Sequence, residues 1–452
     1  VSAFTLEYVA QRCDVPADDI VAAARMFASA KKGTSGTGTG PSMAPHSGLT
    51  EHLSIALNTI CGRVNREGDK LESGYFLYPE TPRRAQVHAA RLAASGAPSR
   101  MRNLRGIRGE MLTTTLAEEI LTPGEGQVRA LIVSGGNPVV AWPDQELTLK
   151  AMKDLELLVV IDHRMSSTAE FAHYVVAPTL SLERADIPHL MDRWFRAPYT
   201  NYTDAITERE GDVLNEWEVF WELAKRMGTT LPFAGGQTPM DERPSDDQMI
   251  DLAYAGSRMP MDEVRANRRK VHPDKIMTVS AADPDCTAKF TVAPDDIVAE
   301  MREIVVEGDG AAALGIDPSL YPFRLVSRRL KHVLNSYGSD LSVLGAKGSS
   351  NSAYMNPDDM KDHDLVDGDL IEIFSPRASV QGLVESAPDV RRGVISMAHS
   401  WGGSSLTDEK VRDIGSPTSR LVSVDKGYDR INGMVVQSAI PVRIAVVEHI
   451  NR

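Results

Sequence analysis

The stretch from Ala130 to Asp162 constrains the fold of this 452-residue chain more than any other segment. It begins with the apolar run Ala130–Val133, which is long enough for a buried strand and too short for a helix. Glycines and a proline interrupt the run at 134–138, an amphipathic segment follows over 147–155, and a second apolar run ends at Asp162. This order of strand, turn, helix and strand predicts two parallel strands joined by a right-handed crossover.

The carboxyl ends of these two predicted strands are where such units bind ligands. The turn at 134–137 offers backbone N–H groups beside a helix, which suits a phosphate. The segment 162–168 offers a carboxylate and hydroxyls, which suit ribose or the edge of a base. The same residues also fit an ordinary tight turn with an Asp that caps the next helix. The local pattern leaves both interpretations open.

Elsewhere the chain alternates between helical and strand-like patterns. Helices are predicted over 5–12, from Pro16 to about 30, and over 49–64, 116–121, 215–227 and 295–306. From about Tyr321 the pattern changes to short alternating strands, predicted at 323–326, 370–374, 380–384, 394–397 and 442–447. Short strands separated by Gly, Pro and Asp turns favour a closed β-barrel, and we expect it to be antiparallel.

Several short phrases, in order, resemble the molybdopterin oxidoreductases of the dimethyl-sulfoxide-reductase family. In the first part of the chain they are GGNP at 135–138, LVVID at 158–162 and SSTAEFAHYVVAP at 166–178. His173 stands where the family usually has Asp, and Ala177 where it has Leu. In the barrel region the phrases are SRR with NS over 327–336, MNPDD with DGD over 355–369, and GV with HSWG over 393–402. The resemblance extends over nearly the whole chain.

The resemblance implies that the intact enzyme binds molybdopterin guanine dinucleotide, in the family's bis form, with molybdenum. Such a cofactor needs permanent cations for its diphosphates and amide or imidazole groups for its pterin edges. The expected cofactor-binding residues are Gly36, Gly38, Ser134, Gly135, Gly136, Asn137, Asp162, Ser167, Thr168, Arg328, Arg329, His332, Asn335, Ser336, His399, Trp401 and Gly402. Taken singly, the glycine loop at 33–40 also fits a flexible linker, the paired Arg328 and Arg329 a solvated patch, and His399 a satisfied surface residue. No catalytic residue and no metal ligand is predicted within this chain.

The expected fold class is α/β, with a parallel Rossmann-like sheet followed by an antiparallel β-barrel domain. We expect residues 1–66 to form helices and the cofactor-loop part of an α/β domain, and 67–127 an irregular connection. Residues 128–310 would form the α/β molybdopterin oxidoreductase domain with an extended excursion, and 311–452 the β-barrel that binds the dinucleotide.

The resemblance further implies that the molybdenum ligand precedes Val1, in a segment that in this family often carries an iron–sulfur cluster. We therefore expect a C-terminal portion that is inactive alone. Its expected partners are the missing N-terminal segment or subunit, a small-molecule substrate and an electron-transfer subunit.

Charge and cysteine usage exclude several classes of protein. The net charge of −13 argues against a nucleic-acid binder. Cys13, Cys61 and Cys286 lie far apart and form no C-x-x-C, so no familiar iron–sulfur or zinc spacing is present. Scattered cysteines fit a reducing, cytoplasmic location. No window approaches the ~18 consecutive apolar residues of a membrane span.

Two other functional classes stay open. One is a non-catalytic scaffold subunit that keeps the fold within an electron-transfer complex, as a related subunit of respiratory complex I does. The other is a plain nucleotide-binding module. The resemblance also leaves the substrate open, since the family handles formate, nitrate, sulfoxides, arsenicals and hydrocarbons in two-electron oxidations or reductions.

Overall fold

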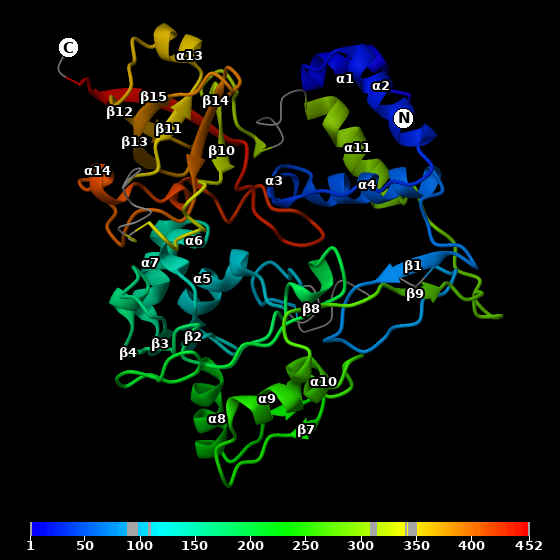
Figure 1. The fold of residues 1–452 in the computed structure, drawn as a ribbon. Coiled ribbons are helices and arrows are strands. Elements are labelled where there is room, and N and C mark those ends of the chain that lie inside the picture. Colours follow the sequence, from blue (N-terminus) through cyan, green and yellow to red (C-terminus); the bar gives the residue numbers. More distant parts are fainter. Residues whose placement is uncertain are drawn as a thin grey trace.

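A computed structural model describes residues 2–87, 98–106, 110–307, 314–339, 341 and 350–450. Figure 1 shows a β-barrel above a small α/β unit, a helical group beside the barrel, and a further helical region at the bottom. Within the described residues, no helix combines the length and the apolar character that crossing a bilayer requires.

The N-terminal part is helical, and one later helix packs against it. Its helices are α1 (Leu6–Cys13), α2 (Ala17–Ser29), α3 (Thr39–Ser42) and α4 (Ser47–Ile60), with α11 (Asp295–Glu307) lying against α4. The predicted helices in these regions are confirmed. Thr5 caps α1 by accepting a hydrogen bond from the Tyr8 amide (3.2 Å).

His46 joins the start of α4 to α11. Its Nδ1 lies 2.7 Å from a carboxylate oxygen of Glu300, and its Nε2 lies 3.0 Å from one of Glu307. Burial alone would lower the pKa of His46, but the bonds to both glutamates outweigh it, and the pKa is raised. An imidazole with a carboxylate at each nitrogen donates both protons, so the bound form is the cation.

The stability of the α4–α11 contact should therefore depend on pH. A raised folded-state pKa stabilises the fold fully below the unfolded pKa of about 6.5 and stops doing so as pH rises through the folded pKa. We expect the free energy of unfolding of the wild type to be higher than that of His46→Gln by about 1 to 3 kcal/mol at pH 6, and by much less at pH 9. Denaturant melts of both proteins across this range measure the difference. A gap that stays constant with pH would contradict the charged pairing.

The α/β unit contains the predicted strand, turn, helix and strand, which are confirmed. Strands β2 (Ala130–Ser134), β3 (Leu157–Ile161) and β4 (Tyr174–Val176) form a parallel sheet in that order. The helices are α5 (Thr113–Leu121), α6 (Pro138–Ala141) and α7 (Gln145–Asp154), and η1 is a short 3₁₀ turn (Ala169–Phe171). Val133, Leu158 and Val160 face α5 and α7 and form a buried core with them.

The region predicted as an irregular connection and an extended excursion has more structure than expected. Beside α8 (Glu216–Arg226), which confirms the predicted helix over 215–227, it contains α9 (Asp246–Ala253), α10 (Met261–Ala266) and η2 (Asp192–Trp194), which were not predicted. Short antiparallel pairs join β1 (Lys70–Ser73) to β9 (Lys275–Thr278), β5 (Tyr199–Thr200) to β8 (Lys270–Val271), and β6 (Pro232–Phe233) to β7 (Gly236–Gln237). Tyr202, Met261 and Val264 share a small core. The strands of the first two pairs lie far apart in sequence, so no local pattern reports them, whereas β6 and β7 are separated by only two residues.

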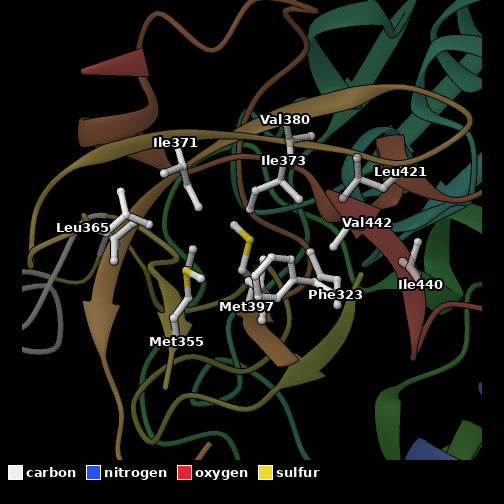
Figure 2. Packing of buried hydrophobic residues seen from close by; sticks show 14 of the residues in the cluster. Phe323, Met355, Leu365, Ile371, Ile373, Val380, Met397, Leu421, Ile440 and Val442 are labelled. Atoms are coloured by element: carbon white, nitrogen blue, oxygen red, sulfur yellow. The ribbon is translucent and has the colours of Figure 1, made fainter. Parts of the chain in front are cut away.

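The C-terminal barrel is closed and has the strand order β10-β14-β11-β13-β12-β15. Its strands are β10 (Phe323–Arg328), β11 (Ala353–Met355), β12 (Leu370–Phe374), β13 (Ser379–Ser386), β14 (Val394–Ala398) and β15 (Ile440–Glu448). Short helices α13 (Pro357–Asp362), α14 (Val411–Ile414) and η4 (Thr418–Leu421) lie in its connections. Figure 2 shows Ile371, Ile373, Met397 and Val442 pointing into one apolar core.

The prediction of an antiparallel barrel is wrong, because the barrel is mixed. β10 pairs with β14, and β11 with β13, in the parallel sense. The reason is strand order: β14 inserts between β10 and β11, so neighbours in the sheet are joined by crossovers as well as hairpins. β11 has only three residues and was absent from the predicted strands.

Candidate functional site

A cavity of about 400 Å³ lies where the parallel sheet meets the barrel. The α/β unit lines it with the turn after β2 (135–137) and with residues 162–167 and Glu170 after β3. The barrel contributes 400–403 and 413–414, and residues 336, 337 and 339 form a third wall. Figure 1 shows α6 and α7 directly beneath the barrel at this junction. The cavity is therefore at the carboxyl ends of the parallel strands, as the sequence predicted.

The first wall is a turn that glycine makes possible. Gly135 has φ +60°, a left-handed conformation that costs glycine little, and its amide donates to the Ile161 carbonyl (3.0 Å). Asn137 is fixed by Thr168, whose amide (3.2 Å) and hydroxyl (2.8 Å) both donate to Asn137 Oδ1. Thr168 is fully buried, so it positions the turn from below.

The second wall follows β3. Asp162 Oδ1 accepts a hydrogen bond from the Arg164 amide (3.1 Å), and the Asp162 amide donates to the Val176 carbonyl (3.1 Å). Arg164 Nη1 lies 3.5 Å from the Ser336 carbonyl oxygen, and the rings of His163 and Tyr337 are 5.5 Å apart. These contacts bring a carboxylate, a guanidinium and an imidazole to one side of the cavity.

The barrel wall contains a buried donor that has no partner among the described residues. Trp401 is 4% exposed, and its Nε1 makes no hydrogen bond to any part of the chain that the structure describes. The next residue, Gly402, has φ +85°, and a Cβ there would lie 2.6 Å from Pro417 Cδ. A buried N–H without an acceptor is costly, so this wall is suited to a ligand that brings one.

The predicted cofactor residues divide into two sets. Those lining the cavity are Gly135, Gly136, Asn137, Asp162, Ser167, Ser336, Trp401 and Gly402. Those outside its lining are Gly36, Gly38, Ser134, Thr168, Arg328, Arg329, His332, Asn335 and His399. Sequence reasoning missed Arg164, Glu170 and Asp413, which line it. Arg164 could have been found, since it follows the strand-end carboxylate by two residues.

Some residues outside the lining have clear local roles. The Arg328 guanidinium lies over the Tyr354 ring, with its carbon 3.8 Å from the centroid, and its Nη1 is buried without a partner in the described residues. Arg329 Nη1 bonds to Asn335 Oδ1. Burial, followed by the nearby Arg329 charge, lowers the pKa of His399. His399 is therefore neutral at pH 7, with Nδ1 2.8 Å from Ser400 Oγ.

The glycine loop and the cysteines lie elsewhere. Gly38 precedes α3, and a Cβ at Gly36 or Gly38 would meet no atom within 4 Å. All three cysteines are free thiols, and none lines the cavity between the sheet and the barrel. Within the described ranges, no group of three His, Cys, Asp or Glu side chains is placed to hold a metal ion.

Two protein-family models match the chain. Residues 25–226 match the molybdopterin oxidoreductase model, and residues 323–434 match the molydopterin dinucleotide binding domain. The two matched segments carry the opposite walls of the cavity, at 135–170 and at 400–414.

Curated relatives are distant in sequence. A probable oxidoreductase YyaE from Bacillus subtilis is 24% identical over 67% of this chain and 45% of its own length. The subunit alpha of a formate dehydrogenase from Methanocaldococcus jannaschii is 22% identical over 88% of this chain and 58% of its own length. The dimethyl sulfoxide reductase DmsA from Escherichia coli is 23% identical over 88% and 52%. The chain thus spans about half the length of the curated relatives it matches.

A solved structure shares the fold. Acetylene hydratase from Pelobacter acetylenicus superposes with a TM-score of 0.68 at 16% identity, covering 98% of this chain and 65% of that one. The motifs, the two family models and the relatives agree. This chain belongs to the molybdopterin oxidoreductases of the dimethyl-sulfoxide-reductase family, whose cofactor is molybdopterin guanine dinucleotide with molybdenum.

Proposed function

We propose that the cavity between the sheet and the barrel holds the nucleotide part of the cofactor. The chain would then be the cofactor-binding portion of a molybdenum oxidoreductase that performs a two-electron oxidation or reduction of a small substrate. The observation that carries this proposal is a ligand-sized cavity at the carboxyl ends of the parallel strands, lined by Trp401, whose buried Nε1 has no partner among the described residues.

The residues around the cavity fit such a ligand. In our proposal the strand–turn–helix–strand unit acts as a Rossmann-like site, with the backbone of 135–137 beside a phosphate. Asp162 would accept hydrogen bonds from guanine or its ribose, and Arg164 would add positive charge for the diphosphate. Gly402 would allow the backbone to approach a planar ring closely. When bound, the molybdenum supplies the two-electron exchange, while these residues bind and orient the cofactor.

The proposed domain boundaries follow the same assignment. We propose residues 1–66 as the helices and cofactor-loop part of an α/β domain, 67–127 as the connection, 128–310 as the α/β molybdopterin oxidoreductase domain, and 311–452 as the dinucleotide-binding domain. An electron-transfer subunit and a cytoplasmic location remain proposals, supported by a relative named as a subunit alpha and by free thiols. The relatives' names include a reductase, a dehydrogenase and a hydratase, so they point to no single substrate. The non-catalytic scaffold stays the alternative function. It is disfavoured by the buried Trp401 Nε1, which has no hydrogen-bond partner among the described residues.

Removing the proposed acceptor should weaken cofactor retention. In the intact enzyme loaded with cofactor, Asp162→Ala should lower the amount of guanine nucleotide bound per chain about tenfold, because a donor on the ligand loses its charged acceptor. The nucleotide is released with acid and quantified by chromatography. Asp154→Ala, an exposed Asp in the last turn of α7, is the matched control and should equal the wild type. Equal nucleotide content in Asp162→Ala and wild type would refute the role given to Asp162.

A further inference from the structure

We propose that Gln145 and Arg420 are positioning residues that hold the barrel wall of the cavity in place against the α/β unit. This inference rests on the proposed function, since it assigns to both residues an effect on cofactor binding. Neither residue lines the cavity itself. The barrel wall is the loop 399–416, which carries Trp401 and Gly402.

The start of α7 is the point where the two units are tied together. Asp144 caps this helix with φ +53°, and its amide donates to the carbonyls of Ser419 and Val422 (both 3.1 Å). Its carboxylate takes two hydrogen bonds from Arg377, both 2.8 Å. A bidentate pair of this kind fixes orientation as well as distance. The helix that follows the cavity turn is therefore anchored to two separate barrel segments.

The next residue, Gln145, makes hydrogen bonds to the barrel domain through both the nitrogen and the oxygen of its side-chain amide. Its Nε2 donates to the Gly403 carbonyl (2.9 Å), and its Oε1 accepts from Arg420 Nε (2.9 Å). Gln145 has no exposed surface. It follows the cavity residue Asn137 by eight positions, while Gly403 itself lines the opposite wall. The Gln145 side chain thus connects the α/β unit directly to the loop that forms the barrel wall.

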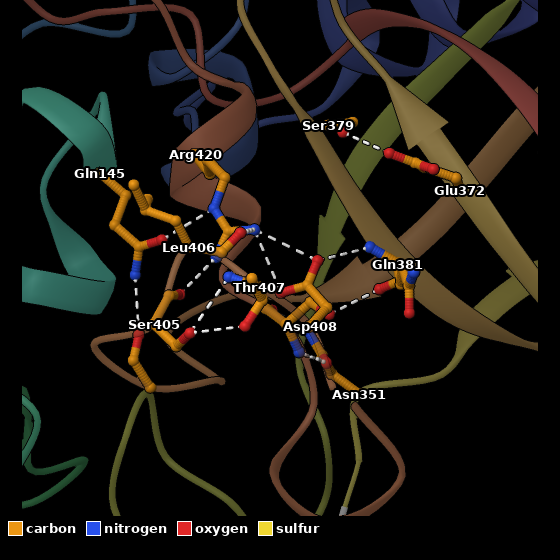
Figure 3. A network of polar contacts seen from close by, with 12 residues as sticks. Gln145, Asn351, Glu372, Ser379, Gln381, Ser405, Leu406, Thr407, Asp408 and Arg420 are labelled. Carbon is orange, nitrogen blue, oxygen red and sulfur yellow. Dashed lines mark hydrogen bonds and ion pairs between the residues drawn. The ribbon is translucent and has the colours of Figure 1, made fainter. Parts of the chain in front are cut away.

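Arg420 holds the middle of the barrel loop. Its Nη1 donates to the Leu406 carbonyl (3.1 Å) and to the Asp408 carboxylate (3.1 and 3.2 Å), and its Nη2 donates to the Ser405 carbonyl (2.9 Å). Figure 3 shows this fork, with Gln145 reaching it from the α/β side. Because the planar guanidinium donates in fixed directions, it fixes residues 405, 406 and 408 of the loop relative to one another.

The base of the same loop is closed independently by Asn351. Its Nδ2 donates to the carbonyls of Ala398 (2.7 Å) and Ser416 (2.9 Å), and its Oδ1 accepts from the Ser416 amide (2.9 Å). The loop ends are therefore fixed within the barrel, and its middle is fixed through Gln145 and Arg420. Loss of the Gln145 amide should free the middle of the loop while the barrel core stays intact.

The test compares Gln145→Ala with the matched control Gln127→Ala. Gln127 lies in the same unit and donates one hydrogen bond to the Ile120 carbonyl (2.8 Å), away from the barrel. In the chain itself, hydrogen exchange of the amides in 399–416 should accelerate roughly tenfold in Gln145→Ala only, as expected for loss of buried hydrogen bonds. Protection in β12 and β13 should stay unchanged, which verifies that the barrel is folded.

The second readout is guanine nucleotide per chain in the intact enzyme, in which the remaining half of a family polypeptide is supplied. It should fall about tenfold in Gln145→Ala and not in Gln127→Ala. Gln145→Glu keeps an acceptor for Arg420 but cannot donate to Gly403, so it should restore protection around 405–408 and not around 403. This partial rescue separates the two bonds of the amide.

The outcomes distinguish the inference from the function on which it rests. Unchanged exchange in 399–416 overturns the proposed anchoring of the loop, whatever the cofactor does. Faster exchange with wild-type nucleotide content overturns the positioning role, leaving the contact purely structural. If the wild-type chain contains no guanine nucleotide even when the remaining half of a family polypeptide is supplied, the proposed function is overturned and, with it, the effect on the cofactor.

Discussion

Replacing Arg420 with methionine should lower the free energy of unfolding by about 3 to 5 kcal/mol, the usual cost of leaving one buried charge without its partner. The side chains of Arg420 and Asp408 are 4% and 7% exposed, so water has little access to the carboxylate that would lose its partner. The Ser405 and Leu406 carbonyls would lose their donor as well. Burial already raises the pKa of Asp408, and the Arg420 charge opposes that shift.

The double variant Arg420→Met with Asp408→Leu tests this cause. Replacing both charges with apolar groups removes the unpaired carboxylate, so the double variant should recover part of the loss. Urea denaturation of the wild type, both single variants and the double variant measures the four free energies. The pair Ser379–Glu372, joined at 2.6 Å in the same barrel and drawn apart from the Arg420 contacts in Figure 3, gives the control Ser379→Ala. We expect that variant to lose less than about 1.5 kcal/mol. A loss in Arg420→Met no greater than this would contradict the buried-pair argument.

Residue pattern alone predicted the elements that bury their side chains locally. The runs at 130–134 and 157–161 are apolar because both strands lie in a parallel sheet with a packed face, and their boundaries matched closely. The cavity at their carboxyl ends followed from topology, since parallel strands present their ends at one edge. The Gly135 turn and Asp162 were therefore located correctly in space.

The barrel arrangement could not be predicted in the same way. Alternation marks which residues face inward, but it does not record which strands are neighbours. β11 is only three residues long, and its phrase around Met355 suggested a cofactor motif rather than a strand. Helix α9 was also missed, although Ser245 and Gln248 form a capping box that marks its start.

The same limit explains the site residues placed outside the cavity. Arg328 was assigned by motif, but its guanidinium packs over the ring of Tyr354, which lies on β11, two strands away in the barrel. Arg329 and Asn335 bond to each other. Gln145 and Arg420 carried no signal at all, because a glutamine at a helix start and an arginine 275 residues later acquire meaning only through their contact. Long-range polar partners are a property of the fold and not of a local pattern.

The chain on its own should neither hold stoichiometric molybdenum nor turn over a small substrate. The curated relatives are about twice as long as the matched region, and the family resemblance implies that the cofactor is enclosed between domains. None of the three cysteines lines the cavity: Cys13 ends α1 and is exposed, Cys61 follows α4, and Cys286 lines a different pocket. The cysteines are also too scattered in sequence to form an iron–sulfur centre with familiar spacing.

We therefore expect a folded, colourless protein whose barrel and sheet are intact, with molybdenum far below one atom per chain. Mass spectrometry of the metal and dye-linked oxidation and reduction assays measure this, and hydrogen exchange of β12 and β13 verifies the fold. Supplying the remaining half of a family polypeptide in the same cell should raise both the metal content and the activity, because the cofactor would then be enclosed from both sides. Stoichiometric molybdenum with turnover in the chain alone would show that these residues suffice to hold and use the cofactor, and the prediction of an inactive chain would be wrong.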